Sequence, residues 1–349
     1  MFDDVDIEGD IYEAIRWAAT LGTALPTRTR IRVMRDLRRL PGDARRSRAE
    51  RPRLTGRLHT KQRDHDAVSH HYDTGNDFFE LFLGDTMTYS CAYYLDPDED
   101  LDVAQRRKLD VVCRKLALEP GDTLLDIGCG WGSLALHAAT TYEATVIGVT
   151  VSAEQAGYAR ARAAQLGVTD RVTIIEGDYR DVEGPFDAIA SVGMVEHVGR
   201  AKLTEYFSTI KRLLSPGGAF LNHGITTRSR HRRRRPTFVS TYVFPDGELV
   251  PIDERLMHAE QAGFEVRDVE SLRMSYARTL RAWVQNLEQR ADEAVAATNA
   301  QVFRIWRLYM AGSVISFEGG HIGVYQELLV DPTRPWLYGR RRLLAHDDH

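Results

Sequence analysis

Cysteine is scarce in this sequence, and long apolar runs are absent. The three cysteines, Cys91, Cys113 and Cys129, are too few for a disulfide framework and lack the spacing of metal ligands. No apolar run approaches the roughly 18 residues of a membrane span, and no apolar segment of a secretory signal follows the acidic start 1–6. These absences argue against a zinc site and against a secreted or membrane-spanning protein. They predict a cytoplasmic one.

Charge is unevenly distributed along the chain. The 349 residues carry a formal net charge of −4, yet residues 28–63 contain fourteen basic side chains and only three acidic ones. Apolar residues at helical spacing predict amphipathic helices over residues 10–22 and 28–40. Residues 41–65 are polar and rich in arginine, so we expect a linker or mobile arm there. A second arginine run, at 228–235, is expected to lie in a loop.

The middle of the chain alternates between the hydrophobic periods of strands and helices. Strands are predicted at 123–127, 145–149, 172–176, 186–192 and 219–225, and helices at 132–141, 153–166 and 202–214. This alternation predicts an α/β fold with a parallel, doubly wound sheet. Ser215–Gly218 predicts a turn before the fifth strand. Beyond it we expect a helix at 251–262, a strand at 264–270, a long helical region at 276–316 and a last strand at 322–330.

The most informative stretch is 124–132, which predicts a strand ending near Asp126, a tight turn and the start of a helix. Three glycines stand at alternate positions in the turn: Gly128, Gly130 and Gly132. Glycine has no Cβ, so backbone amides there can approach a nucleotide-like cofactor. A dinucleotide-binding fold expects an acid after the second strand, where this chain has Thr150, and NAD is therefore disfavoured. Asp178 and Tyr179, after the third strand, offer a carboxylate and a ring suited to adenine.

Six motifs occur in order along the chain. They are HHYDTGNDFF (70–79), YSCAYY (89–94), LDIGCGWG (125–132), GVTVSAEQ (148–155), GMVEHVG (193–199) and YARTLRAW (276–283). Together they resemble the cyclopropane fatty acid synthase and mycolic acid cyclopropane synthase family over roughly residues 66–330. The resemblance implies a Rossmann-like, seven-stranded class I methyltransferase that uses S-adenosylmethionine. It also implies a lipid-binding, largely helical insertion at about 226–316, within a domain 66–349 that follows a helical, arginine-rich extension 1–65.

The same resemblance implies which residues bind the methyl donor and which hold a second ligand. The donor would lie among Tyr89, Ser90, Asp126, Gly128, Gly130, Gly132, Thr150, Gln155, Asp178 and Tyr179. A bicarbonate ion would be held by Cys91, Gly193, Glu196, His223, the backbone of Ile225, and Tyr276. The expected reaction transfers a methyl group to the double bond of an unsaturated acyl chain, on a phospholipid. The resulting carbocation then loses a proton to bicarbonate and closes to a cyclopropane.

The chemistry of these residue types agrees with that expectation. An alkene is a weak nucleophile, so its attack on a sulfonium depends mainly on positioning, and aromatic faces can stabilise the cation that forms. Tyr276, Trp283, Tyr242 and Phe238 are candidates for such faces. Cys91 is expected to donate a hydrogen bond and not to act as a nucleophile.

Simpler explanations exist for single members of this set. Cys91 alone could be a buried small hydrophobe, Glu196 a helix cap, and His223 a core histidine. Other products also stay open: a methylene- or methyl-branched chain, or the methylation of a small molecule on nitrogen or carbon. A non-catalytic S-adenosylmethionine binder is a further alternative.

The basic segments suggest where the protein acts. The default for 228–235 is a solvated loop, but together with 28–63 it could attach the protein to anionic phospholipid at the inner face of the membrane. We expect no nucleic acid partner, because no recognition motif accompanies the charge. A homodimer is left open.

Overall fold

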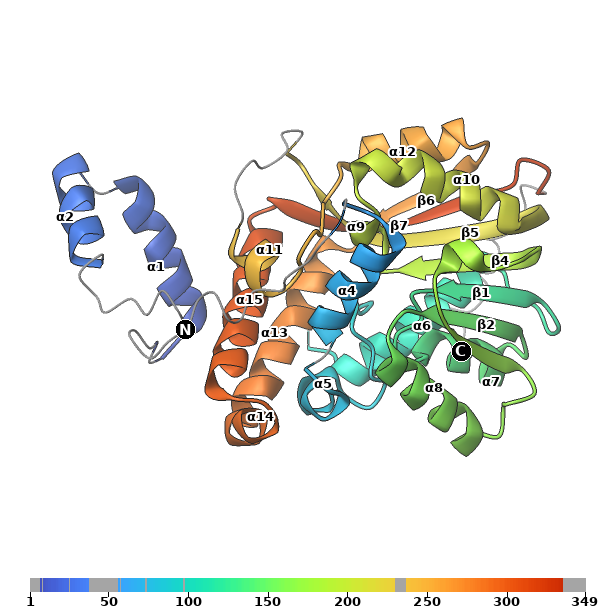
Figure 1. The fold of residues 1–349 in the computed structure, drawn as a ribbon, viewed down its shortest axis with the longest axis horizontal. Helices are drawn as coiled ribbons and strands as arrows, with labels where there is room; N and C mark the ends of the chain where they lie inside the picture. Colours follow the sequence, from blue (N-terminus) through green and yellow to red (C-terminus); the bar gives the residue numbers. More distant parts are fainter. Residues whose placement is uncertain are drawn as a thin grey trace.

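The protein forms one seven-stranded sheet in a computed structural model that describes residues 7, 9–24, 26–37, 56, 58–72, 74–96, 98–229 and 237–334 (Figure 1). The strands are β1 (Thr123–Ile127), β2 (Thr145–Thr150), β3 (Val172–Glu176), β4 (Phe186–Val192), β5 (Leu214–Thr227), β6 (Glu265–Ser271) and β7 (Ile322–Val330). They are ordered β3-β2-β1-β4-β5-β7-β6. The expected Rossmann-like class I methyltransferase sheet is thereby confirmed.

Strand direction changes at one end of the sheet. The first five strands are mutually parallel, as the alternation of strands and helices predicted. β7 runs antiparallel to both of its neighbours, β5 and β6. Periodicity could not reveal this reversal, because a buried strand has the same apolar pattern in either direction.

Two helical layers cover the sheet (Figure 1). On one face α6 (Leu101–Leu116), α7 (Ser133–Thr141) and α8 (Ala153–Gln165) share an apolar core with the strands. On the other face α10 (Leu203–Leu213) and α12 (Ile252–Gln261) do the same. Both faces of the central strands are therefore buried, which explains their continuous apolar runs.

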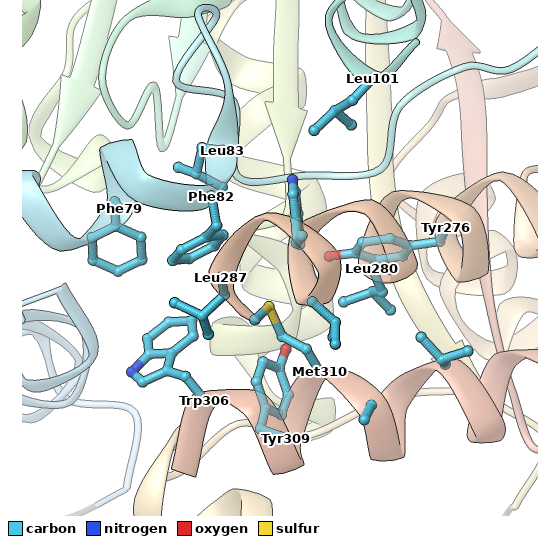
Figure 2. Close-up of a cluster of buried hydrophobic side chains, with 14 of the residues drawn as sticks. Phe79, Phe82, Leu83, Leu101, Tyr276, Leu280, Leu287, Trp306, Tyr309 and Met310 are labelled. Atoms are coloured by element: carbon cyan, nitrogen blue, oxygen red, sulfur yellow. The ribbon is translucent and has the colours of Figure 1, made fainter. Parts of the chain in front are cut away.

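A third core lies beyond the carboxyl ends of the parallel strands and is rich in aromatic residues. It is built from α5 (Asn76–Leu83), α13 (Arg273–Gln289), α14 (Ala291–Ala297) and α15 (Ala300–Glu318), with α11 (Phe238–Tyr242) packed beside it. Figure 2 shows Tyr276 and Leu280 of α13 facing Tyr309 and Met310 of α15. Each large side chain buried in such a core contributes about 1.5–3 kcal/mol.

Three expectations about secondary structure are wrong in part. Residues 61–65, expected in a linker, form the first turn of α4 (Lys61–Tyr72), so the boundary placed at residue 65 lies inside a helix. The expected turn at 215–218 is instead a bulge within β5, where its pairing with β4 shifts register. The long helical region expected at 276–316 is divided into α13, α14 and α15. These differences depend on tertiary contacts, and local sequence propensity carries no information about such contacts.

The N-terminal helices are α1 (Ile11–Ala24) and α2 (Thr27–Leu37), close to their expected positions. α1 packs beside α15, with Ile11 buried, and α2 lies farther from the sheet (Figure 1). Most of the expected arginine-rich arm, and positions 230–235 of the second arginine run, lie outside the described residues. Among the helices that are described, none combines the length and apolar character needed to cross a bilayer.

Candidate active site

A cavity of about 170 Å³ opens at the carboxyl ends of β1, β2 and β4. Open α/β sheets bind ligands at this edge, where the strand order reverses. The cavity is lined by nine of the ten residues expected to bind the cofactor: Tyr89, Ser90, Asp126, Gly128, Gly130, Thr150, Gln155, Asp178 and Tyr179. Positions spread over ninety residues of sequence thus meet around one cavity.

The glycine turn follows β1 and borders this cavity. Gly128 and Gly130 have φ of 74° and 56°, a left-handed conformation that favours glycine. The amides of Gly128 and Cys129 both donate to the carbonyl of Val149, at 2.9 and 3.0 Å, which ties the turn to β2. Gly132 has a different role from the one expected. It lies outside the cavity lining, and a Cβ there would approach the Cβ of Ala159 to 2.9 Å, so its small size allows α7 to pack on α8.

The end of β2 presents a short hydrogen-bonded unit to the cavity. The Thr150 hydroxyl donates to Oε1 of Gln155 at 2.8 Å, and the Ser152 hydroxyl accepts from the amide of Gln155 at 3.3 Å as the cap of α8. Thr150 and Gln155 are both buried. Their side chains are therefore held in place before any ligand binds.

Sequence reasoning missed Lys108, a buried lysine that also lines the cavity. Its ammonium donates to the hydroxyl of Ser90 at 2.8 Å, and burial lowers its pKa to about 8. Burial raises the pKa of Asp126 to about 7, although the charge of Lys108 opposes this shift. A signal was available, because Lys108 and Gln105 fall on the apolar face of α6.

This pair of opposite charges fits a zwitterionic ligand such as the methionine end of S-adenosylmethionine. Oδ2 of Asp126 is buried and has no hydrogen-bond partner among the described residues. It could accept from an ammonium group, while Lys108 could pair with a carboxylate. The residues present therefore fit the cofactor that the sequence predicts.

Helix α4 and the residues before it close one side of the cavity, which the linker expectation did not allow for. His59 and Asp64 line the cavity, and Nδ1 of His59 lies 3.6 Å from Oδ1 of Asp64. Arg180 forms an ion pair with Asp64 at 3.1 Å and another with Asp178 at 2.6 Å, so it links the two carboxylates. Asp178, expected to bind adenine, is therefore also part of an ion-pair network that fastens α4 to the sheet.

Four of the six residues expected to hold bicarbonate gather at the ends of β4 and β5. Oε1 of Glu196, in α9 (Val195–Val198), accepts from the amide of Ile225 at 2.7 Å. The amide of Gly193 donates to the carbonyl of His223 at 2.8 Å. His223 and Ile225 are two residues apart on β5, so their side chains point to the same face.

Two polar atoms in this group are buried without hydrogen-bond partners among the described residues: Oε2 of Glu196 and Nε2 of His223. Burial lowers the pKa of His223 well below its usual value, so the ring is neutral. The amide nitrogen of Gln326 lies 3.4 Å from Nδ1 of His223. With the NH2 group of Gln326 as the donor to Nδ1, the proton of the neutral imidazole is on Nε2. An acceptor and a donor are thus both available to a ligand.

Bicarbonate fits these two atoms chemically. Its O–H group could donate a hydrogen bond to Oε2 of Glu196, and its anionic oxygens could accept one from Nε2 of His223. Burial raises the pKa of Glu196, while the amide of Ile225 and the charge of Arg255 act in the opposite direction. Sequence reasoning missed Arg255 and Gln326, which lie behind this group.

Cys91 and Tyr276 form a second pair, on the α13 side. The Cys91 thiol donates to the carbonyl of Ala92 at 3.2 Å and of Leu272 at 3.7 Å, and Leu272 also accepts from the amide of Tyr276 at 3.0 Å. Burial raises the pKa of Cys91, so the thiol is neutral and a poor nucleophile. Both residues belong to the aromatic core against which Ile225 packs. Their convergence with Glu196 and His223 on one ligand stays a prediction.

Comparison with known proteins connects these features to a family. Residues 59–327 match the model of the mycolic acid cyclopropane synthetase family. A probable fatty acid methyltransferase of Pseudomonas putida is 44% identical over 94% of this chain and 80% of its own. The cyclopropane-fatty-acyl-phospholipid synthase of Escherichia coli K12 is 38% identical over 77% of this chain and 69% of its own.

A solved structure agrees in fold. The mycolic acid cyclopropane synthase CmaA1, complexed with SAH and CTAB, superposes with a TM-score of 0.72 at 35% identity, covering 76% of this chain and 98% of CmaA1. The matched region includes the glycine turn, Glu196 and His223. The chain therefore belongs to the mycolic acid cyclopropane synthetase family and is an S-adenosylmethionine-dependent methyltransferase, in a family whose named members modify fatty acyl chains.

Proposed function

We propose that the protein transfers a methyl group from S-adenosylmethionine to the double bond of an unsaturated acyl chain of a phospholipid, and that the product is a cyclopropane. The observation that carries this proposal is the pair of buried atoms without partners, Oε2 of Glu196 and Nε2 of His223. They lie at the strand ends beside the cofactor cavity, of which Gly193 forms part of the wall. An unpartnered acceptor and donor are costly to bury unless a ligand completes them.

The chain's own residues divide the work of this reaction. S-adenosylmethionine supplies an electrophilic methyl group when bound, and bicarbonate supplies a base. Asp126, Lys108 and the glycine turn hold and orient the donor. Glu196, His223 and the amide that binds Glu196 orient the base, with Tyr276 as a further donor.

The aromatic core provides the water-poor surroundings that a carbocation requires. Trp283 is fully buried. Its ring stacks on that of Tyr89 with 5.2 Å between the ring centroids, and the ring of Tyr276 meets it edge-on with 6.2 Å between the centroids. Aromatic faces attract cations and exclude water, so this wall favours ring closure over capture by water. Tyr242 and Phe238, 5.5 Å apart on α11, pack against the same core.

Lipid analysis tests the reaction directly. We expect phospholipid from cells that express the protein to contain acyl chains heavier by one CH2 group, at the expense of unsaturated chains. Nuclear magnetic resonance of these chains should show cyclopropane protons. Signals of an exocyclic alkene or of a methyl branch would show that the product is a branched chain and not a cyclopropane. Unchanged acyl masses together with methylation of a small amine would contradict the proposal.

We also propose that α1 and α2 bring the enzyme to an anionic membrane surface. Trp17 is 66% exposed and Ile31 is 63% exposed, so α1 and α2 each present a large apolar side chain at the surface. Arg28, Arg32 and Arg35 are exposed on α2 near Ile31. Apolar side chains beside arginines are typical of helices that lie in a membrane interface. α1 also contacts α15, so the surface adjoins the aromatic core where the acyl chain would react.

Vesicle binding tests this surface. Replacing Arg28, Arg32 and Arg35 with glutamine should weaken binding to phosphatidylglycerol vesicles by about 100-fold, from about 1 kcal/mol per basic residue. Trp17→Ala should weaken it further in a co-sedimentation assay. Leu166→Ala, which removes an exposed apolar side chain at the C-terminal cap of α8, is the matched control. Equal binding to phosphatidylcholine vesicles, or no loss in the arginine variant, would argue against the proposal.

A further inference from the structure

A fully buried ion pair lies directly behind the candidate bicarbonate site. Arg255 of α12 is 1% exposed and pairs with Glu327 of β7, which is 0% exposed. Taking two charges out of water costs several kcal/mol per ion, and the attraction between them repays this cost only when further hydrogen bonds satisfy both groups. An apolar pair of similar volume would often be at least as stable. Fold stability alone therefore does not explain the pair.

The carboxylate of Glu327 is held by a chain of polar groups from the sheet and α10. Its Oε2 accepts from the side-chain amide of Asn222 at 2.8 Å, and Oδ1 of Asn222 accepts from the hydroxyl of Tyr206 at 3.0 Å. Asn222 and Tyr206 are both fully buried. The position of Glu327, and through it that of Arg255, is thus determined by three secondary-structure elements.

Both terminal nitrogens of the Arg255 guanidinium donate to the backbone of β5. Nη2 donates to the carbonyl of Gly224 at 3.2 Å, and Nη1 donates to the carbonyl of Ile225 at 3.3 Å. The carbonyl of Gly224 and the amide of Ile225 belong to one peptide group, and that amide donates to Oε1 of Glu196 at 2.7 Å. A peptide group is planar, so holding its oxygen also sets the direction of its N–H bond.

Close packing leaves this peptide little freedom. A Cβ at Gly224 would approach Cγ1 of Val195 to 2.3 Å, Nη1 of Arg255 to 2.7 Å and Oε2 of Glu196 to 3.6 Å. Only glycine lets α9 and the guanidinium reach the strand together. The carboxylate of Glu196 is therefore placed by contacts that converge on the same peptide from both sides.

We propose that Arg255 and Glu327 are positioning residues, which hold the Gly224–Ile225 peptide so that Glu196 presents its second oxygen to the bicarbonate ion. The proposal rests on the proposed function, because it assigns the pair a role in orienting the base of that reaction. The pair touches neither substrate nor cofactor in this role. It acts through one peptide group.

The double variant Arg255→Met/Glu327→Gln separates positioning from folding. Both charges are removed together, the glutamine can still accept from Asn222, and no unpaired charge remains buried. We expect the variant to be folded, with a KM for S-adenosylmethionine within about twofold of the wild type. We expect kcat to fall by about 10- to 100-fold, as for a small misplacement of a catalytic group, and the bicarbonate concentration for half-maximal rate to rise.

Two further variants complete the experiment. Arg255→Lys keeps the charge but cannot hold two carbonyls, so its kcat should lie between those of the wild type and the double variant. Lys211→Met/Asp331→Asn removes a partly buried ion pair between α10 and the residue after β7 and should leave kcat unchanged.

The outcomes are distinct. A folded double variant with wild-type kcat and bicarbonate dependence overturns the positioning role. If the double variant does not fold, an unchanged kcat in Arg255→Lys overturns it instead. Absence of acyl methylation by the wild type refutes the proposed function itself, whatever the result for Arg255.

Discussion

Replacing Glu196 with glutamine lowers the kcat of acyl methylation by about 100- to 1,000-fold, the loss typical of removing one group that stabilises charge in a transition state. The substitution keeps the shape of the side chain. It exchanges one carboxylate oxygen for an NH2 group, so either the contact with the amide of Ile225 or the acceptor offered to bicarbonate is lost. Glutamine is also neutral and could not orient the O–H group of bicarbonate as a carboxylate does.

Three measurements locate the effect in this site. The rate is followed by transfer of a labelled methyl group to phospholipid, and binding of S-adenosylhomocysteine is measured by calorimetry and should be unchanged. The wild type should slow in buffer depleted of carbon dioxide and recover when bicarbonate is added, whereas the variant should stay slow. Glu154→Gln, an exposed position in the first turn of α8, is the matched control. A Glu196→Gln enzyme as fast as the wild type would exclude the carboxylate from the reaction.

Replacing Gly130 with valine weakens S-adenosylmethionine binding by at least about 100-fold, which corresponds to about 2.8 kcal/mol. Gly130 lines the cavity, and its Cβ would point toward Nε2 of Gln155 at 4.0 Å. A branched side chain would therefore occupy space that the ligand needs. It would also strain a backbone with φ of 56°.

A matched glycine separates these two causes. Gly167 has φ of 68°, and a Cβ there meets no atom within 4 Å. Gly167→Val should lower the free energy of unfolding by about 1–2 kcal/mol, as Gly130→Val does through strain, but should leave the dissociation constant of S-adenosylmethionine unchanged. Urea titration and calorimetry measure the two quantities. Equal binding by Gly130→Val and the wild type would place the cofactor elsewhere.

Local sequence was sufficient for much of the fold and of the cofactor site. The strand that contains Asp126 and the glycine turn after it were predicted from hydrophobic period and glycine spacing. Thr150, in place of an acid after the second strand, argued against NAD. Each of these signals lies within a few neighbouring residues. Side-chain period and turn chemistry act over that range, so a single sequence shows them directly.

The resemblance to a family supplied Glu196, His223 and their neighbours, and the structure brings four of those six residues together at the ends of β4 and β5. It did not supply Lys108, whose charge was hidden on an apolar helix face. It also did not supply the start of α4, because the residues that begin this helix are polar and charged. Their ion pairs with Arg180 and Asp246 exist only once the chain has folded.

The sequence by itself determined the strands of the sheet and the cofactor class, because these follow from local periodicity and from motifs with a known chemistry; the groups that hold bicarbonate stay a prediction. Only the tertiary structure decided that β7 runs antiparallel, that α4 closes the cavity, and that Arg255 holds the peptide that binds Glu196. Arg255 and Glu327 are 72 residues apart, and no sequence motif around either residue indicates its role. A buried charged residue can be identified only together with the opposite charge that pairs with it. That pairing forms when distant strands and helices come into contact.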